Sequence, residues 1–303
     1  MPPPAPICVL LNPDGGAASV RPRIAAEITE LFGALGQEAE VVVLPHGQDP
    51  VEAARSASAR SAIVVAAGGD GTVCGVAAGL ADGSAALGIL PLGTLNHFAK
   101  DLRIPLDLAG AVAVVAAGHT ERIDAGFVND RVFVNNSSIG IYPSIVDARE
   151  ALRGQGYRKW PAMALATARL VRRYRGVKVT IEIDRRRHTW RTPFVFVGNN
   201  EYTIDGSRLG SRERLDEGVL FVYLAPRIRA RHLPLLLVKA LAGRARQSGE
   251  FEIVRAGELW IDRSRSGRAQ HVALDGEVRI MKTPLHYQMR PGALRVVVPQ
   301  KLT

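Results

Sequence analysis

Two alternating patterns of apolar residues fill the first 125 or so positions of the chain. Short continuous apolar runs, such as residues 7–13 and 61–66, are typical of strands that are buried on both faces. Between these runs, apolar residues recur at helical spacing, and this alternation predicts a parallel sheet covered by helices on both sides. The expected strands are 7–13, 40–44, 61–66 and 85–91, and the expected helices are 23–35, 50–59, 74–81 and 106–117.

The pattern changes near residue 124, where β-like runs joined by polar loops become dominant. They predict a second domain built on an antiparallel sheet, interrupted by helical segments at about 157–174 and 228–245. We expect the last strand, 293–299, to return to the first domain. The expected division is an α/β domain at 1–124 plus 291–303 and a β-rich domain at 125–290.

A glycine-rich segment, Gly68-Gly69-Asp70-Gly71-Thr72, joins a predicted strand to a predicted helix. Glycines at such a turn allow several backbone N–H groups to point at one spot, and the start of a helix adds partial positive charge. A phosphate group is the natural ligand of this arrangement. The alternative is an ordinary tight turn, because the spacing matches neither a Walker A loop nor a dinucleotide fingerprint.

Two similar clusters favour the phosphate interpretation. Residues 12–16 (NPDGG) follow the first predicted strand, and residues 93–96 (GTLN) follow the fourth. All three clusters therefore lie at the carboxyl ends of predicted parallel strands, which is the edge where open α/β sheets bind ligands.

The clusters resemble those of the diacylglycerol kinase catalytic-domain family, particularly its soluble bacterial lipid kinases, within the wider group that includes sphingosine kinases and NAD kinases. GGDGT is shared with the NAD kinases, whereas the downstream motifs are more specific. The resemblance implies an NAD-kinase-like, Rossmann-like α/β domain, an antiparallel β-sandwich-like lipid domain, and a cleft between them where ATP and lipid meet. The matching motifs are NPDGG (12–16), GGDGT (68–72), PLGTLNHFAKDL (91–102), NNSSIG (135–140), GNN (198–200), LDEG (215–218) and LDGE (274–277).

The activity that the resemblance implies is transfer of the γ-phosphate of ATP to a lipid hydroxyl, with diacylglycerol as the acceptor, phosphatidic acid as the product, and Mg²⁺ as the metal ion. Asp70 is expected to bind Mg²⁺ through water, and the alternative is a cap on the following helix. The nucleotide-binding residues implied are Asn12, Gly15, Gly68, Gly69, Asp70, Gly71, Thr72, Thr94 and Asn96.

Asp275 matches the aspartate with which similar lipid kinases activate the lipid hydroxyl. Glu277 is expected to assist it through a hydrogen bond or the metal ion. From the residues alone, the simpler interpretation of Asp275-Gly276 is a two-residue turn between strands. The resemblance favours the catalytic role.

Two residues depart from the family pattern at the implied metal sites. His97 stands where some relatives carry an aspartate of an Asp–water–Mg²⁺ network, and Glu217 stands where the family has a second aspartate. A structural Mg²⁺ could be held by Glu217 with the backbone oxygens of Arg214 and Val219. The alternatives to a diacylglycerol kinase are a kinase for a sphingoid or other lipid alcohol, and a catalytically impaired regulatory protein that binds nucleotide or lipid.

The net charge of +10 favours a polyanionic partner, although a basic proteome would also explain it. Residues 157–175 and 227–246 combine apolar centres with basic flanks, which is typical of helices on an anionic membrane surface or of helices packed on the sheet. Two cysteines and the lack of a long apolar run favour a cytoplasmic protein, peripherally associated with membrane. We expect no nucleic-acid partner and keep a homodimer as one alternative for the assembly.

Overall fold

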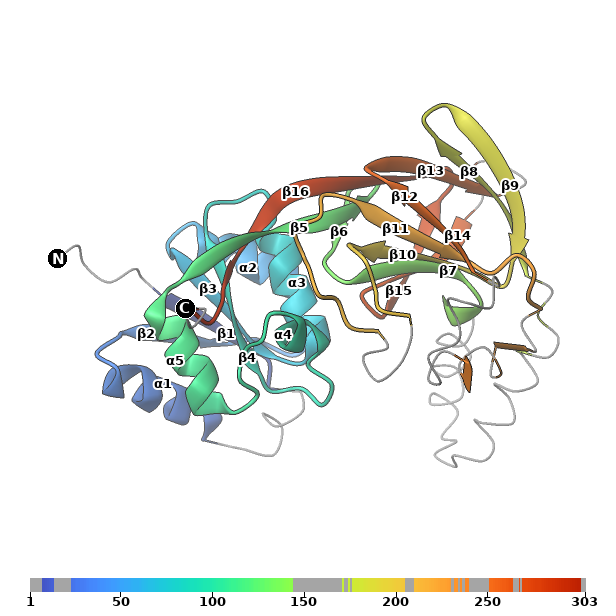
Figure 1. Cartoon of the computed structure of the whole chain (residues 1–303). Helices are drawn as coiled ribbons and strands as arrows, with labels where there is room; N and C mark the ends of the chain where they lie inside the picture. The colour runs from blue at the N-terminus through green and yellow to red at the C-terminus, as the bar shows by residue number, and fades with distance from the viewer. Residues whose placement is uncertain are drawn as a thin grey trace. The chain divides into compact units, whose positions relative to one another are not determined.

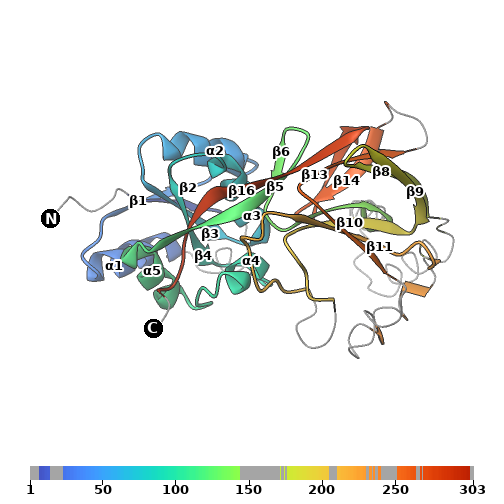
Figure 2. The same ribbon diagram turned by 45° about the horizontal axis from the view of Figure 1, so that its top comes forward.

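The fold divides into two units in a computed structural model of the chain. One unit comprises Met1–Ala125 with Pro291–Thr303, and the other comprises Gly126–Arg290, so the division lies beside the expected boundary at residue 124. Two paired strands, β5 (Thr120–Val128) and β16 (Leu285–Val297), have residues in both units. Figure 2 shows these two strands side by side. The structure describes residues 7–13, 23–143, 171, 174, 176–204, 210–229, 232, 233, 235, 238, 239, 251–263, 267 and 269–300.

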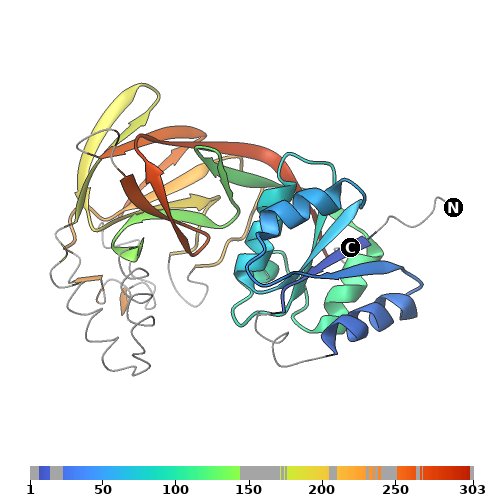
Figure 3. The same cartoon turned by 180° about the vertical axis from the view of Figure 1, so that it is seen from behind.

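The first unit is an α/β domain, as the apolar runs predict. Its parallel sheet has the order β2-β1-β3-β4, and Val296 at the end of β16 pairs in parallel with Leu87 of β4. Helices α1 and α5 lie on one face of the sheet and α2 and α3 on the other, as seen from the front in Figure 1 and from behind in Figure 3. The elements are β1 (Ile7–Leu11), α1 (Ile24–Ala34), β2 (Ala39–Val43), α2 (Pro50–Ser58), β3 (Ile63–Gly68), α3 (Asp70–Leu80), β4 (Ala86–Pro91), α4 (His97–Asp101) and α5 (Leu108–Ala117).

Burial on both faces explains why these strands read as continuous apolar runs. Every residue of β1, β3 and β4 is buried, whereas β2 at the edge of the sheet is partly exposed. Two of the described helices, α2 and α5, begin where a short acidic side chain caps them. Asp49 accepts a hydrogen bond from the Val51 N–H at the start of α2, and Asp107 accepts one from Gly110 at the start of α5.

Two features of the first unit differ from the expectation. Helix α3 starts at Asp70 rather than at Cys74, so Asp70, Gly71 and Thr72 form its first turn instead of a loop. Helix α4 was not predicted, because five residues are too few to show a helical period.

The second unit is a β-sandwich-like domain, which confirms the expected antiparallel, β-rich class. One layer has the strand order β12-β11-β10-β7-β14-β15, and the other contains β16-β13-β8-β9. All described pairs within this unit are antiparallel. The strands are β6 (Arg131–Phe133), β7 (Asn136–Gly140), β8 (Val177–Ile183), β9 (Arg186–Thr192), β10 (Phe194–Asn199), β11 (Leu220–Leu224), β12 (Glu252–Ala256), β13 (Glu258–Arg263), β14 (Ala269–Leu274) and β15 (Glu277–Lys282), with β16 completing the layer.

Alternation along the strands decides which side chains fill the sandwich. On β7 and β10, Ile139, Val195 and Val197 are fully buried in the core between the layers. Residues of the opposite parity, including Phe194 and Phe196, therefore lie on the outer face of the six-stranded layer.

The two predicted helical segments with basic flanks, 157–175 and 227–246, lie largely outside the described residues, so neither the membrane-surface interpretation nor packing on the sheet is tested. Within the part of the chain that the structure describes, no helix is both long and apolar enough to traverse a bilayer.

Candidate functional site

One candidate site, in the first unit, lies where the strand order of the parallel sheet reverses. The chain passes from β1 to β2 on one side and to β3 on the other, so the carboxyl ends of β1 and β3 flank a topological switch point. Asn12, which follows β1, donates from Nδ2 to Oγ1 of Thr72 in the first turn of α3, at 2.9 Å. This hydrogen bond brings together two of the three clusters that the sequence singled out.

The start of α3 has the geometry of an anion site. Gly69 is the N-cap residue, and among the described residues no side chain caps this helix. The first amides of a helix have no partner within the helix and carry its partial positive charge. Gly68 is required here for another reason, because a Cβ on it would lie 2.7 Å from Oγ1 of Thr72.

Asp70 is the first residue of α3 and does not cap that helix. Its Oδ1 instead accepts a hydrogen bond of 2.7 Å from the backbone N–H of His97, the first residue of α4. Its other carboxylate oxygen, Oδ2, has no partner among the described residues. One carboxylate oxygen is thus available for a hydrated Mg²⁺, which prefers hard oxygen ligands, and that role stays a prediction.

The third cluster, residues 93–96, packs directly on the glycine-rich segment 68–72. Asn96 has a left-handed backbone, with φ of 51°, and its side chain is bound within its own turn. Oδ1 accepts from the Gly93 N–H at 3.0 Å, and Nδ2 donates to the Gly93 oxygen at 2.9 Å. Asn96 is buried, whereas Thr94 is exposed. The geometry therefore makes Asn96 a support for the loop and leaves Thr94 accessible to a ligand.

We predict that Gly93→Ala lowers the free energy of unfolding by about 1–3 kcal/mol, the usual cost of overpacking, and weakens nucleotide binding. The new Cβ would lie 2.6 Å from the Cα of Gly69 and 2.8 Å from Oδ1 of Asn96, so the two loops would have to separate. Chemical denaturation and titration with a fluorescent ATP analogue measure the two effects.

Gly33→Ala is the matched control, because a Cβ there meets nothing within 4 Å in helix α1. This variant should be as stable as the parent or slightly more stable. Equal behaviour of the two variants would contradict the close packing of the loops as the reason for Gly93.

A second candidate site lies in the other unit, at the β14–β15 turn. Asp275 and Gly276 both have positive φ, 48° and 93°, as a two-residue hairpin turn requires. The Asp275 carboxylate also accepts three backbone N–H groups. Oδ2 accepts from Val134 at 2.9 Å, and Oδ1 accepts from Asn135 at 2.8 Å and Asn136 at 3.0 Å. Asp275 therefore forms a two-residue turn and also carries a carboxylate held by three N–H groups. The two interpretations of this residue that the sequence allowed do not exclude each other.

Two opposing effects act on the pKa of Asp275. Burial of the carboxyl group raises the pKa, and the three N–H groups and the positive charge of Arg212 lower it. Burial is the larger effect, so the pKa lies above the ordinary value of 3.8. A carboxylate with a raised pKa and a fixed orientation is suited to accepting a proton.

Arg212 supports the strand segment that holds Asp275. It is 4% exposed, and its Nη1 donates to the Val134 oxygen at 2.6 Å and to the Asn199 oxygen at 3.1 Å. Its Nη2 donates to Oδ1 of Asn135 at 2.7 Å. Asn199 also binds this segment, because its Nδ2 donates to the Val134 oxygen at 2.9 Å. The N–H groups that face Asp275 are therefore held from behind.

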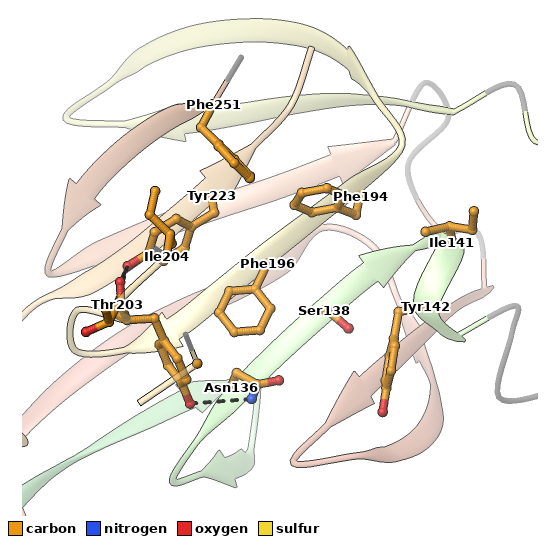
Figure 4. Close-up of a pocket in the computed structure, with 12 residues that line it drawn as sticks. Asn136, Ser138, Ile141, Tyr142, Phe194, Phe196, Thr203, Ile204, Tyr223 and Phe251 are labelled. Atoms are coloured by element: carbon orange, nitrogen blue, oxygen red, sulfur yellow. Dashed lines mark hydrogen bonds between the residues drawn. The ribbon is translucent and has the colours of Figure 1, made fainter. Parts of the chain in front are cut away.

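An apolar pocket of about 330 Å³ lies on the outer face of the six-stranded layer. Asn136 lines it, and the same residue donates its backbone N–H to Asp275. Figure 4 shows aromatic side chains around the pocket, from β10 and β11 among others. The described lining residues are Asn136, Ser138, Ile141, Tyr142, Phe194, Phe196, Tyr202, Thr203, Ile204, Gly210, Tyr223 and Phe251.

The remaining predicted site residues are less closely connected to these groups. Glu277 is exposed, and its Oε2 pairs with Arg279 at 2.8 Å. Gly15 lies outside the described residues, and the exposed Gly71 is in the first turn of α3. Their predicted roles stay predictions.

The structural metal site proposed at Arg214, Glu217 and Val219 falls on one loop. Glu217 is fixed by its N–H, which donates to Oδ1 of Asn200 at 3.0 Å, and by its Oε2, which accepts from the Glu201 N–H at 3.2 Å. Within the described residues, no three His, Cys, Asp or Glu side chains cluster as metal ligands. A site here would depend on one carboxylate and two backbone oxygens, and it stays a prediction.

Sequence reasoning missed Arg212 and the N–H groups of residues 134–136. Backbone donors carry no signature in a sequence, and a single arginine in a basic chain has nothing to mark it. The two Asn-Asn pairs, 135–136 and 199–200, were the available signal, because each pair lies beside a strand of the same sheet.

Comparison with known proteins finds a matching family model for each of the two units. Residues 6–128 match the family model of the diacylglycerol kinase catalytic domain, and residues 145–298 match that of the YegS C-terminal NAD kinase beta sandwich-like domain. Among curated proteins, the diacylglycerol kinase of Staphylococcus saprophyticus is 33% identical over 134 residues, 44% of this chain and 44% of that protein. The diacylglycerol kinase of Staphylococcus epidermidis is 38% identical over 96 residues, 31% of this chain and 30% of that protein. The matches thus span less than half the length of these relatives.

Solved structures extend the likeness to nearly the whole chain. The crystal structure of a diacylglycerol kinase from Bacillus anthracis has a TM-score of 0.71 at 17% identity and covers 97% of each chain. Another from the same organism has a TM-score of 0.77 at 20% identity and covers 97% of this chain and 95% of that one. At these identities the likeness shows the fold, and the family models show the membership. The chain belongs to the diacylglycerol kinase catalytic-domain family, in the group that carries the YegS-type β-sandwich-like domain.

Proposed function

We propose that the protein is a lipid kinase that transfers the γ-phosphate of ATP to the free hydroxyl of diacylglycerol and yields phosphatidic acid. One observation carries the proposal: Asn136 connects a basic carboxylate to an apolar pocket. Its backbone N–H binds Asp275, and the residue itself lines the pocket. An acceptor with an apolar body and a terminal hydroxyl fits this combination, and the names of the curated relatives support it.

In the proposed reaction, Asp275 accepts the proton of the lipid hydroxyl. The hydroxyl oxygen forms a bond to the γ-phosphorus of ATP, and the bond from that phosphorus to the bridging oxygen of ADP breaks. Phosphoryl transfer needs little covalent work from the protein beyond positioning and charge stabilisation. The raised pKa of Asp275 favours proton transfer from a weakly acidic alcohol.

The nucleotide phosphates are proposed to bind at the start of α3. The donors would be the first amides of that helix, with Asn12 and Thr94 beside them, because these groups follow strands β1, β3 and β4. Mg²⁺, when bound, neutralises phosphate charge. Asp70 has a carboxylate oxygen suited to a water-mediated contact with that ion, whereas the His97 side chain supplies no carboxylate.

The lipid is proposed to come from an anionic membrane surface, because a diacylglycerol resides in a bilayer and the chain carries a net charge of +10. A sphingoid or other long-chain alcohol would satisfy the same pocket chemistry and is the alternative acceptor. A protein that binds nucleotide or lipid without turnover is the alternative outside enzymes.

We expect single-turnover reaction with γ-labelled ATP, Mg²⁺ and a mixed lipid extract to label phosphatidic acid. A labelled sphingoid phosphate would instead identify the alternative acceptor. Bound ATP with no labelled lipid under any condition would contradict the kinase proposal and favour the regulatory alternative.

A further inference from the structure

Ser138 places a hydroxyl group in the wall of the pocket, which is lined largely by aromatic and aliphatic side chains. It lies on β7 two residues beyond Asn136, so both side chains are on the outer face of the layer. Figure 4 shows the two on the same strand, and both line the pocket. The neighbours across the sheet are Phe196 on β10 and Ala273 on β14, neither of which has a polar side chain.

The Ser138 hydroxyl is buried without a hydrogen-bond partner. The residue is 5% exposed, and its Oγ is one of two buried side-chain polar atoms that lack a partner among the described residues. Buried hydroxyl groups are nearly always satisfied, so an unsatisfied one that lines a cavity indicates a missing ligand atom. The adjacent Ser137 shows the contrast, because its Oγ lies 2.9 Å from the Tyr287 hydroxyl in the core.

Spacing along β7 defines where that ligand atom would be. Asn136 is bound to Asp275, and Ser138 lies two residue steps further along the strand, a rise of roughly 7 Å. In diacylglycerol the ester carbonyl oxygens lie only a few bonds from the free hydroxyl. A hydroxyl held at Asp275 would therefore leave an ester group near Ser138, with the acyl chains among the aromatic side chains.

We propose that Oγ of Ser138 donates a hydrogen bond to an ester carbonyl oxygen of the acceptor, and that this contact selects acylated glycerol over alcohols without such a carbonyl. The inference rests on the proposed function, which it refines by assigning a residue to acceptor specificity. Hydrogen-bonding sites reject analogues that lack the matching group, because the buried polar atom is then left unpaired.

The test compares 1,2-dioctanoylglycerol with its diether analogue, which has the same hydroxyl and chains but no carbonyl oxygens. The unmodified protein should show higher kcat/KM for the ester. Ser138→Ala should reduce kcat/KM for the ester by roughly 5-fold, the value of one hydrogen bond, and leave the diether unchanged. Its Tm should equal or exceed that of the parent, because the removed hydroxyl has no partner among the described residues.

Ser137→Ala is the matched control on the other face of the strand. It should lower Tm, since it removes the partner of Tyr287, while the ratio of ester to diether stays unchanged. An unaltered ratio in Ser138→Ala would overturn the inference and leave the kinase proposal intact. If neither lipid is phosphorylated, calorimetric titration of both lipids without ATP measures whether the protein binds the ester more tightly than the diether. A Ser138-dependent preference for the ester would then support the inference alone, and equal binding would overturn it.

Discussion

Replacement of Asp275 by asparagine is expected to reduce phosphate transfer by about 10²- to 10⁴-fold, the usual contribution of a general base, with nucleotide affinity unchanged. The amide keeps the shape of the carboxylate and can accept the N–H groups of Asn135 and Asn136, but it cannot take a proton from the lipid hydroxyl. Asparagine also tolerates the left-handed backbone at φ of 48°, where alanine would add strain. The loss should therefore be one of kcat, measured with thermal unfolding as a check on the fold.

Asp184→Asn is the matched control for this substitution. Asp184 occupies the same kind of turn, between β8 and β9, with positive φ of 49°, and it is exposed. Its replacement should leave kcat unchanged. If Asp275→Asn retains kcat within a few-fold of the parent, Asp275 is not the base.

The pH dependence of kcat is an independent test of the proposed role of Asp275. Because burial raises the pKa of Asp275 above 3.8, the base is protonated over a wider acidic range than an exposed aspartate would be. The acidic limb of kcat should rise with pH through that elevated pKa, and Asp275→Asn should abolish it. An acidic limb at the ordinary aspartate value would show that the carboxylate is solvated during turnover.

More of the fold than of the candidate sites could be predicted from the sequence. Continuous apolar runs and their spacing gave the parallel sheet, because strands buried on both faces must be apolar throughout. Asp275 could be nominated only through the resemblance, since an Asp-Gly turn explains the same two residues. What distinguishes it is the backbone of residues 134–136, about 140 positions away, and no local pattern encodes that contact.

The glycine-rich segment shows another limit of pattern reasoning. Its glycines suggested a phosphate loop, but Gly68 is explained by its contact with Thr72, and Gly93 of the neighbouring cluster is explained by its contact with Gly69. Close packing of two loops and binding of a phosphate both require a backbone without a Cβ atom. A glycine therefore does not show by itself which of the two is present. The resemblance assigned Asn96 to the nucleotide, and the structure shows its side chain bound within its own turn.

Replacement of Arg212 by methionine is expected to lower the free energy of unfolding by about 2–4 kcal/mol and to reduce kcat as well. The substitution removes the donor to three buried acceptors, on Val134, Asn135 and Asn199. Unsatisfied buried acceptors are strongly destabilising. For a unit of this size, the change corresponds to a fall in Tm of roughly 5–15 °C.

The fall in kcat should be accompanied by a change in its pH dependence, which a loss of stability alone would not cause. Arg212 lowers the pKa of Asp275 through its charge, so its loss should raise that pKa further and move the acidic limb of kcat to higher pH. Arg212→Lys retains the charge but not the planar fork of donors, so its acidic limb should stay near that of the parent while its Tm falls.

Arg187→Met provides the control for loss of an arginine. Its side chain is 74% exposed and paired with Glu182, and such surface pairs contribute little. Tm and the pH profile should therefore match the parent. If Arg212→Met loses stability while its acidic limb stays in place, Arg212 supports the fold without tuning Asp275. If Tm and the limb both stay, the hydrogen bonds of Arg212 neither stabilise the fold nor influence the pKa of Asp275.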